Sequence, residues 1–291
     1  MFTKIMVPLD GSELAERALA SAERLASLSG ATLQLVRVVA LPLTSGWIAG
    51  PTYLPASVYE EVLQADTKAA TEYLKTIMER LATATFPVRA QVLTGNIASS
   101  LLDYEQETGT DLVIMTSHGR TGLARFALGS IADRLLRQGS APVLLVRSFG
   151  TPVSMAQIVA PLDGSKRAEA ALTMVQHLAP ALAHEVTLLR VIHGAQEGPE
   201  AERYLQDAAQ HLHQEGLVCW SQVVQGDPAQ AIIDVAGTDK LVVMATHGRS
   251  GVARWALGSV ADRVARYAGA EVLLVRSMQG EGSASAATVT K

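Results

Sequence analysis

An internal repeat constrains this chain more than any other feature of its sequence. Residues 118–148 and 247–277 align without a gap, and 21 of the 31 paired residues are identical. The copies also begin alike, because IMVPLDGS from Ile5 is matched by IVAPLDGS from Ile158. Such a repeat indicates two units built on one plan. We place them at residues 1–149 and 154–278, and we expect the small, polar residues 279–291 to form a disordered tail.

Within each unit, short aliphatic runs alternate with longer amphipathic ones. Unit one contains the strand-like runs KIMVPL, ATLQLVRVV, PVRAQVL, DLVIMT and PVLLVR, with helices predicted near 13–29, 57–83, 97–108 and 130–139. Strands as apolar as DLVIMT are typical of sheets covered on both faces. The sequence therefore predicts an α/β protein made of two tandem, doubly wound, five-stranded parallel sheets with helices on both faces, which is a Rossmann-like fold.

Composition excludes several classes of protein. A single cysteine, Cys219, cannot form an intrachain disulfide framework or a cysteine-based metal cluster, and we interpret it as a small buried hydrophobe. The net charge of −4 provides no field for holding a polyanion, so we expect no nucleic-acid partner. We expect no membrane partner either, because no run reaches the roughly 18 apolar residues of a membrane span. Without an apolar leader, the chain is expected in the cytoplasm.

Two short motifs fall where parallel α/β sheets bind ligands, at the carboxyl ends of the strands. Asp10 and its counterpart Asp163 follow the first strand of each unit, and a glycine-rich loop follows the fourth. The loop's glycines, arginines and serine can bind an anion at the start of the next helix. Two structural alternatives remain open: Ser130–Asp133 and Ser259–Asp262 match a capping box, and Asp-Gly is a common turn.

The spacing of these motifs resembles the universal stress protein family, whose nucleotide-binding members carry G-x2-G-x9-G-[ST] after the fourth strand. Gly119 and Gly129-Ser130 fit the later elements of this pattern, as do Gly248 and Gly258-Ser259. The chain departs from it at the first glycine, which is Thr116 in unit one and Ala245 in unit two. The resemblance covers nearly the whole chain, twice.

The resemblance implies that each unit binds ATP or a related adenine nucleotide, with Mg²⁺ as a further possible component. Asp10 and Asp163 would then contact a ribose hydroxyl or the metal, and the glycine loop would hold the phosphates. The implied binding residues are Pro8, Leu9, Asp10, Val38, Thr116, His118, Gly119, Arg120, Gly129, Ser130 and Ile131 in unit one, and Pro161, Leu162, Asp163, Val191, Ala245, His247, Gly248, Arg249, Gly258, Ser259 and Val260 in unit two.

We expect a non-enzymatic regulator that passes nucleotide occupancy to a partner. A slow ATPase and a nucleotide-independent scaffold are the alternatives; against the enzyme, the chain has no G-x4-G-K-[ST] loop and no motif that places a nucleophile beside His118 or His247. The strands PVLLVR and EVLLVR are expected to pair and join the units as a pseudo-dimer, and a further homodimer is possible.

Unit two lacks 24 residues net relative to unit one, mostly after the second strand. Unit one has a long segment there, in which Trp47 and Tyr53 can cover a base or simply pack on a neighbouring element. We expect unit one to bind nucleotide more tightly for this reason, although the larger Thr116 opposes that preference.

Overall fold

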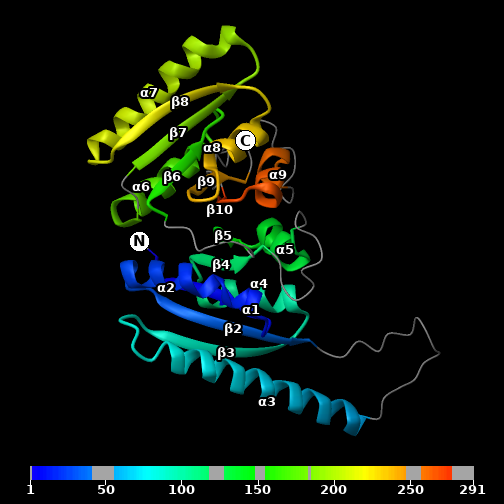
Figure 1. Ribbon diagram of the computed structural model, residues 1–291. Coiled ribbons are helices and arrows are strands. Elements are labelled where there is room, and N and C mark those ends of the chain that lie inside the picture. The colour runs from blue at the N-terminus through cyan, green and yellow to red at the C-terminus, as the bar shows by residue number, and fades with distance from the viewer. Residues whose placement is uncertain are drawn as a thin grey trace, which may run out of the picture.

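The computed structural model describes residues 2–40, 56–117, 128–147, 155–182, 185–246 and 257–276. Unit one begins with a strand and alternates strands with helices throughout (Figure 1). Its elements are β1 (Lys4–Pro8), α1 (Glu13–Glu16), α2 (Ala18–Ser29), β2 (Thr32–Ala40), α3 (Ala56–Arg80), β3 (Val88–Gly95), α4 (Ile97–Thr108), β4 (Leu112–Thr116), α5 (Ser130–Gln138) and β5 (Val143–Val146).

Unit two repeats the order of strands and longer helices, but among its described residues it has no counterpart of α1, and a short 3₁₀ helix precedes its second long helix. Its elements are β6 (Gln157–Pro161), α6 (Glu169–Leu182), β7 (Glu185–Ile192), the 3₁₀ helix η1 (Ala195–Glu197), α7 (Gly198–Gln214), β8 (Cys219–Gln225), α8 (Pro228–Ala236), β9 (Leu241–Ala245), α9 (Ser259–Tyr267) and β10 (Glu271–Val275).

The two five-stranded sheets join edge to edge into one sheet of ten strands, in the order β3-β2-β1-β4-β5-β10-β9-β6-β7-β8. All pairs within a unit are parallel, and only the junction between β5 and β10 is antiparallel. Leu144 lies opposite Leu273 at the centre of this junction. The predicted parallel sheets and the predicted pairing of the two terminal strands are both confirmed.

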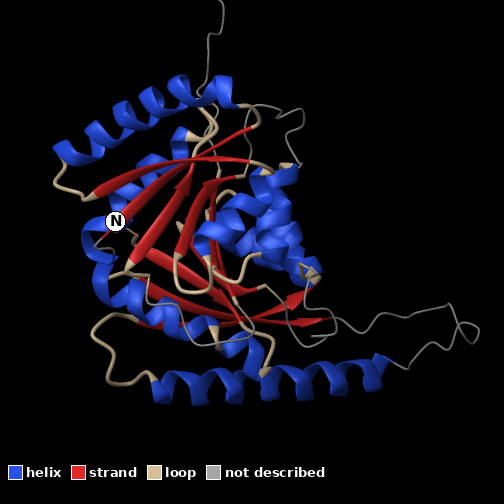
Figure 2. Cartoon of the chain, turned by 45° about the horizontal axis from the view of Figure 1, so that its top comes forward, coloured by secondary structure: helices blue, strands red, loops and turns tan. Residues whose placement is uncertain are grey.

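Helices cover both faces of the sheet, as Figure 2 shows. Successive residues of β1 enter opposite cores: Ile5 and Val7 pack with α2 and α3, whereas Met6 packs with α4 and α5. Both core layers continue across the junction into unit two, with α6 and α7 on one face and α8 and α9 on the other. The apolar character of the strands therefore reflects burial on both faces.

The predicted helices form close to their expected positions, with one difference. The run 13–29 is divided at Arg17, whose N–H donates to the carbonyls of Leu14 and Ala15 in a tightened turn, so a short α1 precedes α2. Gly30 and Gly109 end α2 and α4 in the left-handed conformation, with φ of 69° and 63°. This conformation is accessible to glycine at little cost, which explains where these helices stop.

The units differ most between their second strand and the next helix. In unit two, β7 is followed almost directly by η1 and α7, whereas in unit one α3 begins only at Ala56. Trp47 and Tyr53 lie outside the described residues, as does the expected tail at 279–291. Among the helices that the structure describes, no helix is long and apolar enough to cross a membrane.

Candidate functional site

A pocket of about 490 Å³ lies at the carboxyl ends of the strands in unit one. It is bounded by the ends of β1, β2 and β4, by one side of α3 and by the first turns of α4 and α5. All the described residues that the sequence predicted for unit one line it, namely Pro8, Leu9, Asp10, Val38, Thr116, Gly129, Ser130 and Ile131.

Unit two has a matching pocket of about 320 Å³ at the ends of β6, β7 and β9. The described residues predicted for this unit again lie together in its wall, namely Pro161, Leu162, Asp163, Val191, Ala245, Gly258, Ser259 and Val260. Both volumes fall within the range of small-molecule sites, at roughly 300–1,000 Å³. The duplication has thus produced two pockets in which the predicted residues occupy equivalent positions.

Asp10 lies in the tight turn that follows β1. Its Oδ1 accepts hydrogen bonds from the Ser12 amide at 2.9 Å and the Ser12 hydroxyl at 2.6 Å, and Ser12 Oγ in turn caps α1. Asp163 makes the same contact with the Ser165 amide at 2.9 Å. The turn role suggested by the sequence is therefore real, and it also fixes each carboxylate in the wall of its pocket.

The first turns of α5 and α9 do not form the capping boxes that the sequence allowed. Gly129 and Gly258 are the N-caps and supply no side-chain hydrogen bond, and Ser130 and Ser259 are already the first helical residues. Neither serine hydroxyl has a hydrogen-bond partner within the described part of the chain. Each helix thus begins at the pocket with its first amides and one hydroxyl available to a ligand.

The glycines at these two N-caps are not required by the backbone. Gly129 has φ −59° and ψ 144°, and Gly258 has φ −60° and ψ 146°, which any L-residue can adopt. Gly11 and Gly164 differ, because their φ values of 84° and 77° favour glycine. Backbone conformation therefore does not explain why glycine stands at positions 129 and 258. A ligand that approaches the backbone closely would explain it, because a side chain would then be in the way.

Sequence reasoning missed an arginine in the floor of each pocket. Arg37 lies over the ring of Tyr73 from α3, with Cζ 4.9 Å from the centroid, and its guanidinium occupies the space that a Cβ on Gly11 would need. Arg190 lies 5.9 Å from the Tyr204 ring and donates to the Leu162 carbonyl at 3.2 Å. The signal was an arginine at the same place in two apolar strands, LVRVV and LLRVI.

The residues at the first position of the glycine pattern are both buried in the pocket walls. Thr116 ends β4 with 5% of its surface exposed, and Ala245 ends β9 with 8% exposed. The next residues, Ser117 and Thr246, accept hydrogen bonds from the amides of Gly129 and Gly258, each at 2.9 Å. The glycine loops therefore leave and rejoin the fold beside the pockets.

Several predicted residues fall within those loops. The structure does not describe them, so their predicted roles stay predictions: His118, Gly119 and Arg120 in unit one, and His247, Gly248 and Arg249 in unit two. Among the described residues, no group of three or more His, Cys, Asp or Glu side chains could hold a metal ion. Cys219 is buried as expected, and burial raises the pKa of its thiol to about 11.

The fold and its paired pockets define a tandem α/β protein with a candidate ligand site at the carboxyl end of each parallel half-sheet. The universal stress protein family model matches residues 1–147 and 155–276, so the chain belongs to this family. A universal stress protein of Mycolicibacterium smegmatis is 28% identical over 289 residues, covering 94% of this chain and 96% of the relative. A single-unit relative from Bacillus subtilis is 28% identical over 148 residues, covering 50% of this chain and 100% of its own length.

Solved structures agree with this fold. A universal stress protein from Archaeoglobus fulgidus superposes with a TM-score of 0.74 at 17% identity, covering 94% of this chain and 98% of the other. A universal stress protein described from Pseudomonas aeruginosa superposes with a TM-score of 0.69 at 16% identity, covering 94% and 93% of the two chains. The two-unit arrangement is therefore shared with other members of the family.

Proposed function

We propose that each unit binds ATP or a related adenine nucleotide, and that the protein acts as a non-enzymatic regulator in a stress response. The observation that carries this proposal is the uncapped first turn of α5 and of α9, which lies in the pocket wall. There, Gly129 and Gly258 have no conformational need to be glycine, and Ser130 and Ser259 have hydroxyls without partners in the described chain. An uncapped helix N-terminus in a pocket is suited to a phosphate group.

The remainder of each pocket suits a nucleoside. Apolar side chains such as Leu9 and Val38 can pack against a base, and Asp10, held rigidly by its turn, can accept hydrogen bonds from ribose hydroxyls or contribute to a Mg²⁺ site. Arg37 lies against this turn, with its guanidinium next to Gly11. Unit two presents the equivalent groups in Leu162, Val191, Asp163 and Arg190.

The residues that line the two pockets favour a regulatory role over catalysis. Neither pocket has, among its described lining residues, a lysine of the kind that P-loop enzymes place on phosphates. The nucleotide would thus be held as a signal and its occupancy read by a partner.

The experiment begins with the purified native protein. Mass spectrometry of the denatured protein is expected to release an adenine nucleotide, and calorimetry on the stripped protein is expected to show ATP binding without measurable turnover. Turnover that Asp10→Ala abolishes would support the slow-ATPase alternative. Absence of both a co-purifying nucleotide and ATP binding would support the nucleotide-independent scaffold.

A further inference from the structure

The wall behind the second strand differs between the two pockets. In unit one it consists of Ala40 with Asp66 and Ala69 from α3, and the pocket measures about 490 Å³. In unit two His193 and Glu197 occupy this side, and the pocket measures about 320 Å³. The unit-two pocket is therefore the smaller of the two.

The smaller pocket is also bordered by a hydrogen-bonded turn. Glu197 Oε1 accepts hydrogen bonds from the amides of His193 at 3.3 Å and Gly194 at 3.1 Å. The helix α7 begins at the next residue, Gly198. Because the carboxylate ties the turn to the start of a long helix, the wall cannot retreat to admit a larger ligand without breaking these bonds.

The charge at the pocket rim differs as well. The N-cap of α4 is the neutral Asn96, whereas the N-cap of α8 is Asp227, and the residues that follow them, Ile97 and Pro228, line the two pockets. The hydrogen bond from the Gln230 amide and that from Arg263 lower the pKa of Asp227, so it is charged at neutral pH. A charged cap offsets the positive end of the helix dipole, and a neutral cap does not.

The difference between Asn96 and Asp227 also decides whether an arginine on the neighbouring helix forms an ion pair. Arg263 Nη1 contacts both carboxylate oxygens of Asp227, at 2.9 and 2.8 Å. Arg134, at the same place on α5, instead approaches the neutral groups Gln138 Oε1 at 3.4 Å and Ser99 Oγ at 3.5 Å. Within the described residues Arg134 makes no ion pair. Unit one therefore keeps a cation that is unpaired within the described chain at the first turn of α4, whose Ile97 lines the pocket, whereas in unit two the corresponding cation and helix end are both compensated by Asp227.

We propose that the two sites divide adenine nucleotides by phosphate number: unit one prefers the triphosphate, and unit two prefers a nucleotide with one phosphate group. This inference rests on the proposed function and adds to it the specificity of each site. Asn96 and Asp227 are the specificity-determining residues, because they set the rim charge while both remain good helix caps. The smaller volume of unit two acts in the same direction.

The test compares ATP with AMP at each isolated site. Gly258→Asp places a carboxylate at the phosphate position of unit two and leaves unit one to be measured, and Gly129→Asp does the reverse. Calorimetry is expected to give a higher ratio of ATP affinity to AMP affinity for unit one than for unit two. Adding Asn96→Asp to the Gly258→Asp variant is expected to lower that ratio about two- to five-fold at unit one. Adding Asp227→Asn to the Gly129→Asp variant is expected to raise it at unit two by about the same factor.

Asp103→Asn is the matched charge control, because Asp103 is exposed on α4 and does not line the pocket. It is expected to leave the ratio unchanged, and thermal unfolding checks that each variant is folded. Equal ratios at the two sites, or ratios that do not respond to the exchanges at 96 and 227, would overturn this inference alone. Absence of adenine-nucleotide binding to the unsubstituted chain would overturn the proposed function and the inference together.

Discussion

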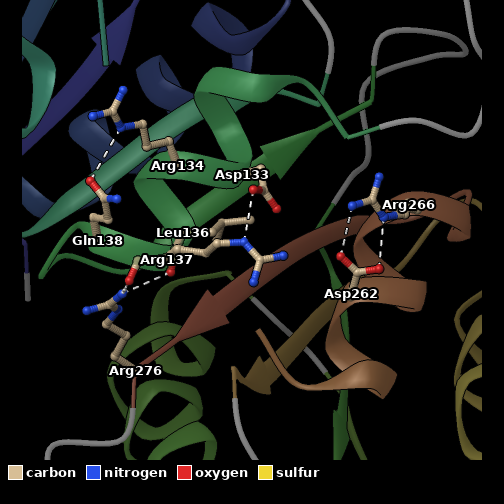
Figure 3. Close-up of polar contacts among 8 residues, drawn as sticks. All are labelled: Asp133, Arg134, Leu136, Arg137, Gln138, Asp262, Arg266 and Arg276. Carbon is tan, nitrogen blue, oxygen red and sulfur yellow. Dashed lines mark hydrogen bonds and ion pairs between the residues drawn. The ribbon is translucent and has the colours of Figure 1, made fainter. Parts of the chain in front are cut away.

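Arg147 in unit one and Arg276 in unit two are reciprocal: each donates to the carbonyls at the end of the helix that begins at the other unit's pocket. Arg147 Nη1 donates to Ala265 O at 3.1 Å, and its Nε donates to Ala270 O at 2.7 Å. Arg276 Nη2 donates to the carbonyls of Leu136, at 3.1 Å, and Arg137 (Figure 3). The chain junction is thus fastened at the two helices that carry the candidate phosphate sites.

The same two helices each carry an ion pair along their length. Arg137 pairs with Asp133 at 2.9 Å and Arg266 with Asp262 at 2.8 Å (Figure 3). The hydrogen bond to Asp133 raises the pKa of Arg137, and the charge of Asp262 from the other unit raises it further. Arg266, from the same helix as Asp262, acts in the opposite direction and lowers the pKa of Arg137.

Arg147→Ala is expected to lower the free energy of unfolding by about 1.5–3 kcal/mol, because it leaves partly buried carbonyls without a charged donor. Burial lowers the pKa of Arg147 to about 10, an effect that Glu271 partly offsets, so the side chain is charged at neutral pH. Urea unfolding measures the change. Arg147→Lys should recover only part of it, because a single ammonium cannot span both carbonyls. A loss no larger than that of an exposed arginine would show that the contact contributes little.

Ser21→Ala is expected to destabilise the junction by about 1–3 kcal/mol, since it removes a buried hydrogen bond to a carboxylate. Ser21 Oγ lies 3.0 and 3.2 Å from the two carboxylate oxygens of Glu271, and both residues are buried. Ser99→Ala on α4 serves as a less buried comparison and should cost less. If the two substitutions lowered the urea midpoint equally, the hydrogen bond between Ser21 and Glu271 would contribute no more to stability than the less buried one of Ser99.

The turn after β1 can be tested by comparing two glycines with similar φ. Gly11→Ala and Gly30→Ala both place a Cβ at positive φ, but only the former overlaps a side chain, that of Arg37. Moving Arg37 away from Tyr73 would lose a cation–π contact, so Gly11→Ala should cost about 0.5–1 kcal/mol more than Gly30→Ala. It should also weaken nucleotide binding at unit one. Equal costs in thermal unfolding, with unchanged binding, would contradict the role given to Arg37.

Cys219 predicts a pH dependence. Its pKa is about 11 in the folded protein because of burial, whereas an exposed thiol titrates near about 8.5. Above that pH the unfolded chain loses the proton first, so stability is lost as pH rises from about 8.5 towards 11. The difference in unfolding free energy between the unsubstituted chain and Cys219→Val should therefore shift in favour of the variant over this range. A difference that is constant with pH would contradict the burial of the thiol.

The fold could be predicted because the signals were local and repeated. Apolar runs such as DLVIMT indicated strands buried on both faces, and the match of PVLLVR to EVLLVR indicated edges that pair. The division of the first helix at Arg17 could not be predicted, because both parts are apolar on one side and only the backbone turn separates them. The possible homodimer stays a prediction.

The candidate site was less accessible to sequence reasoning. Motifs at strand ends identified Asp10 and Ser130, but the capping-box alternative failed because the helix begins one residue earlier than that motif requires. Arg37 was missed because its role depends on Tyr73, which comes from a helix distant in the sequence. Glu197 was missed because only the tertiary fold brings η1 to the pocket. Side chains contributed by other elements leave little local signal.

The two sites are predicted to differ in strength. Gly129→Asp should reduce ATP affinity of the whole chain more than Gly258→Asp, because unit one has the larger pocket and because Arg134, at the first turn of α4, has no carboxylate partner among the described residues. Both glycines have backbone conformations open to aspartate, so the variants should fold. If Gly258→Asp removed the tighter ATP site and Gly129→Asp did not, unit two would be the stronger site and the prediction would be wrong.

The most direct test of the proposed nucleotide sites is calorimetry with ATP on the stripped, unsubstituted protein and on the double variant Gly129→Asp, Gly258→Asp. We expect two binding events for the unsubstituted chain and no binding in the double variant, whose added carboxylates lie where the uncapped first turns of α5 and α9 should meet phosphate. No ATP binding to the unsubstituted chain, or unchanged binding to a folded double variant, would contradict it.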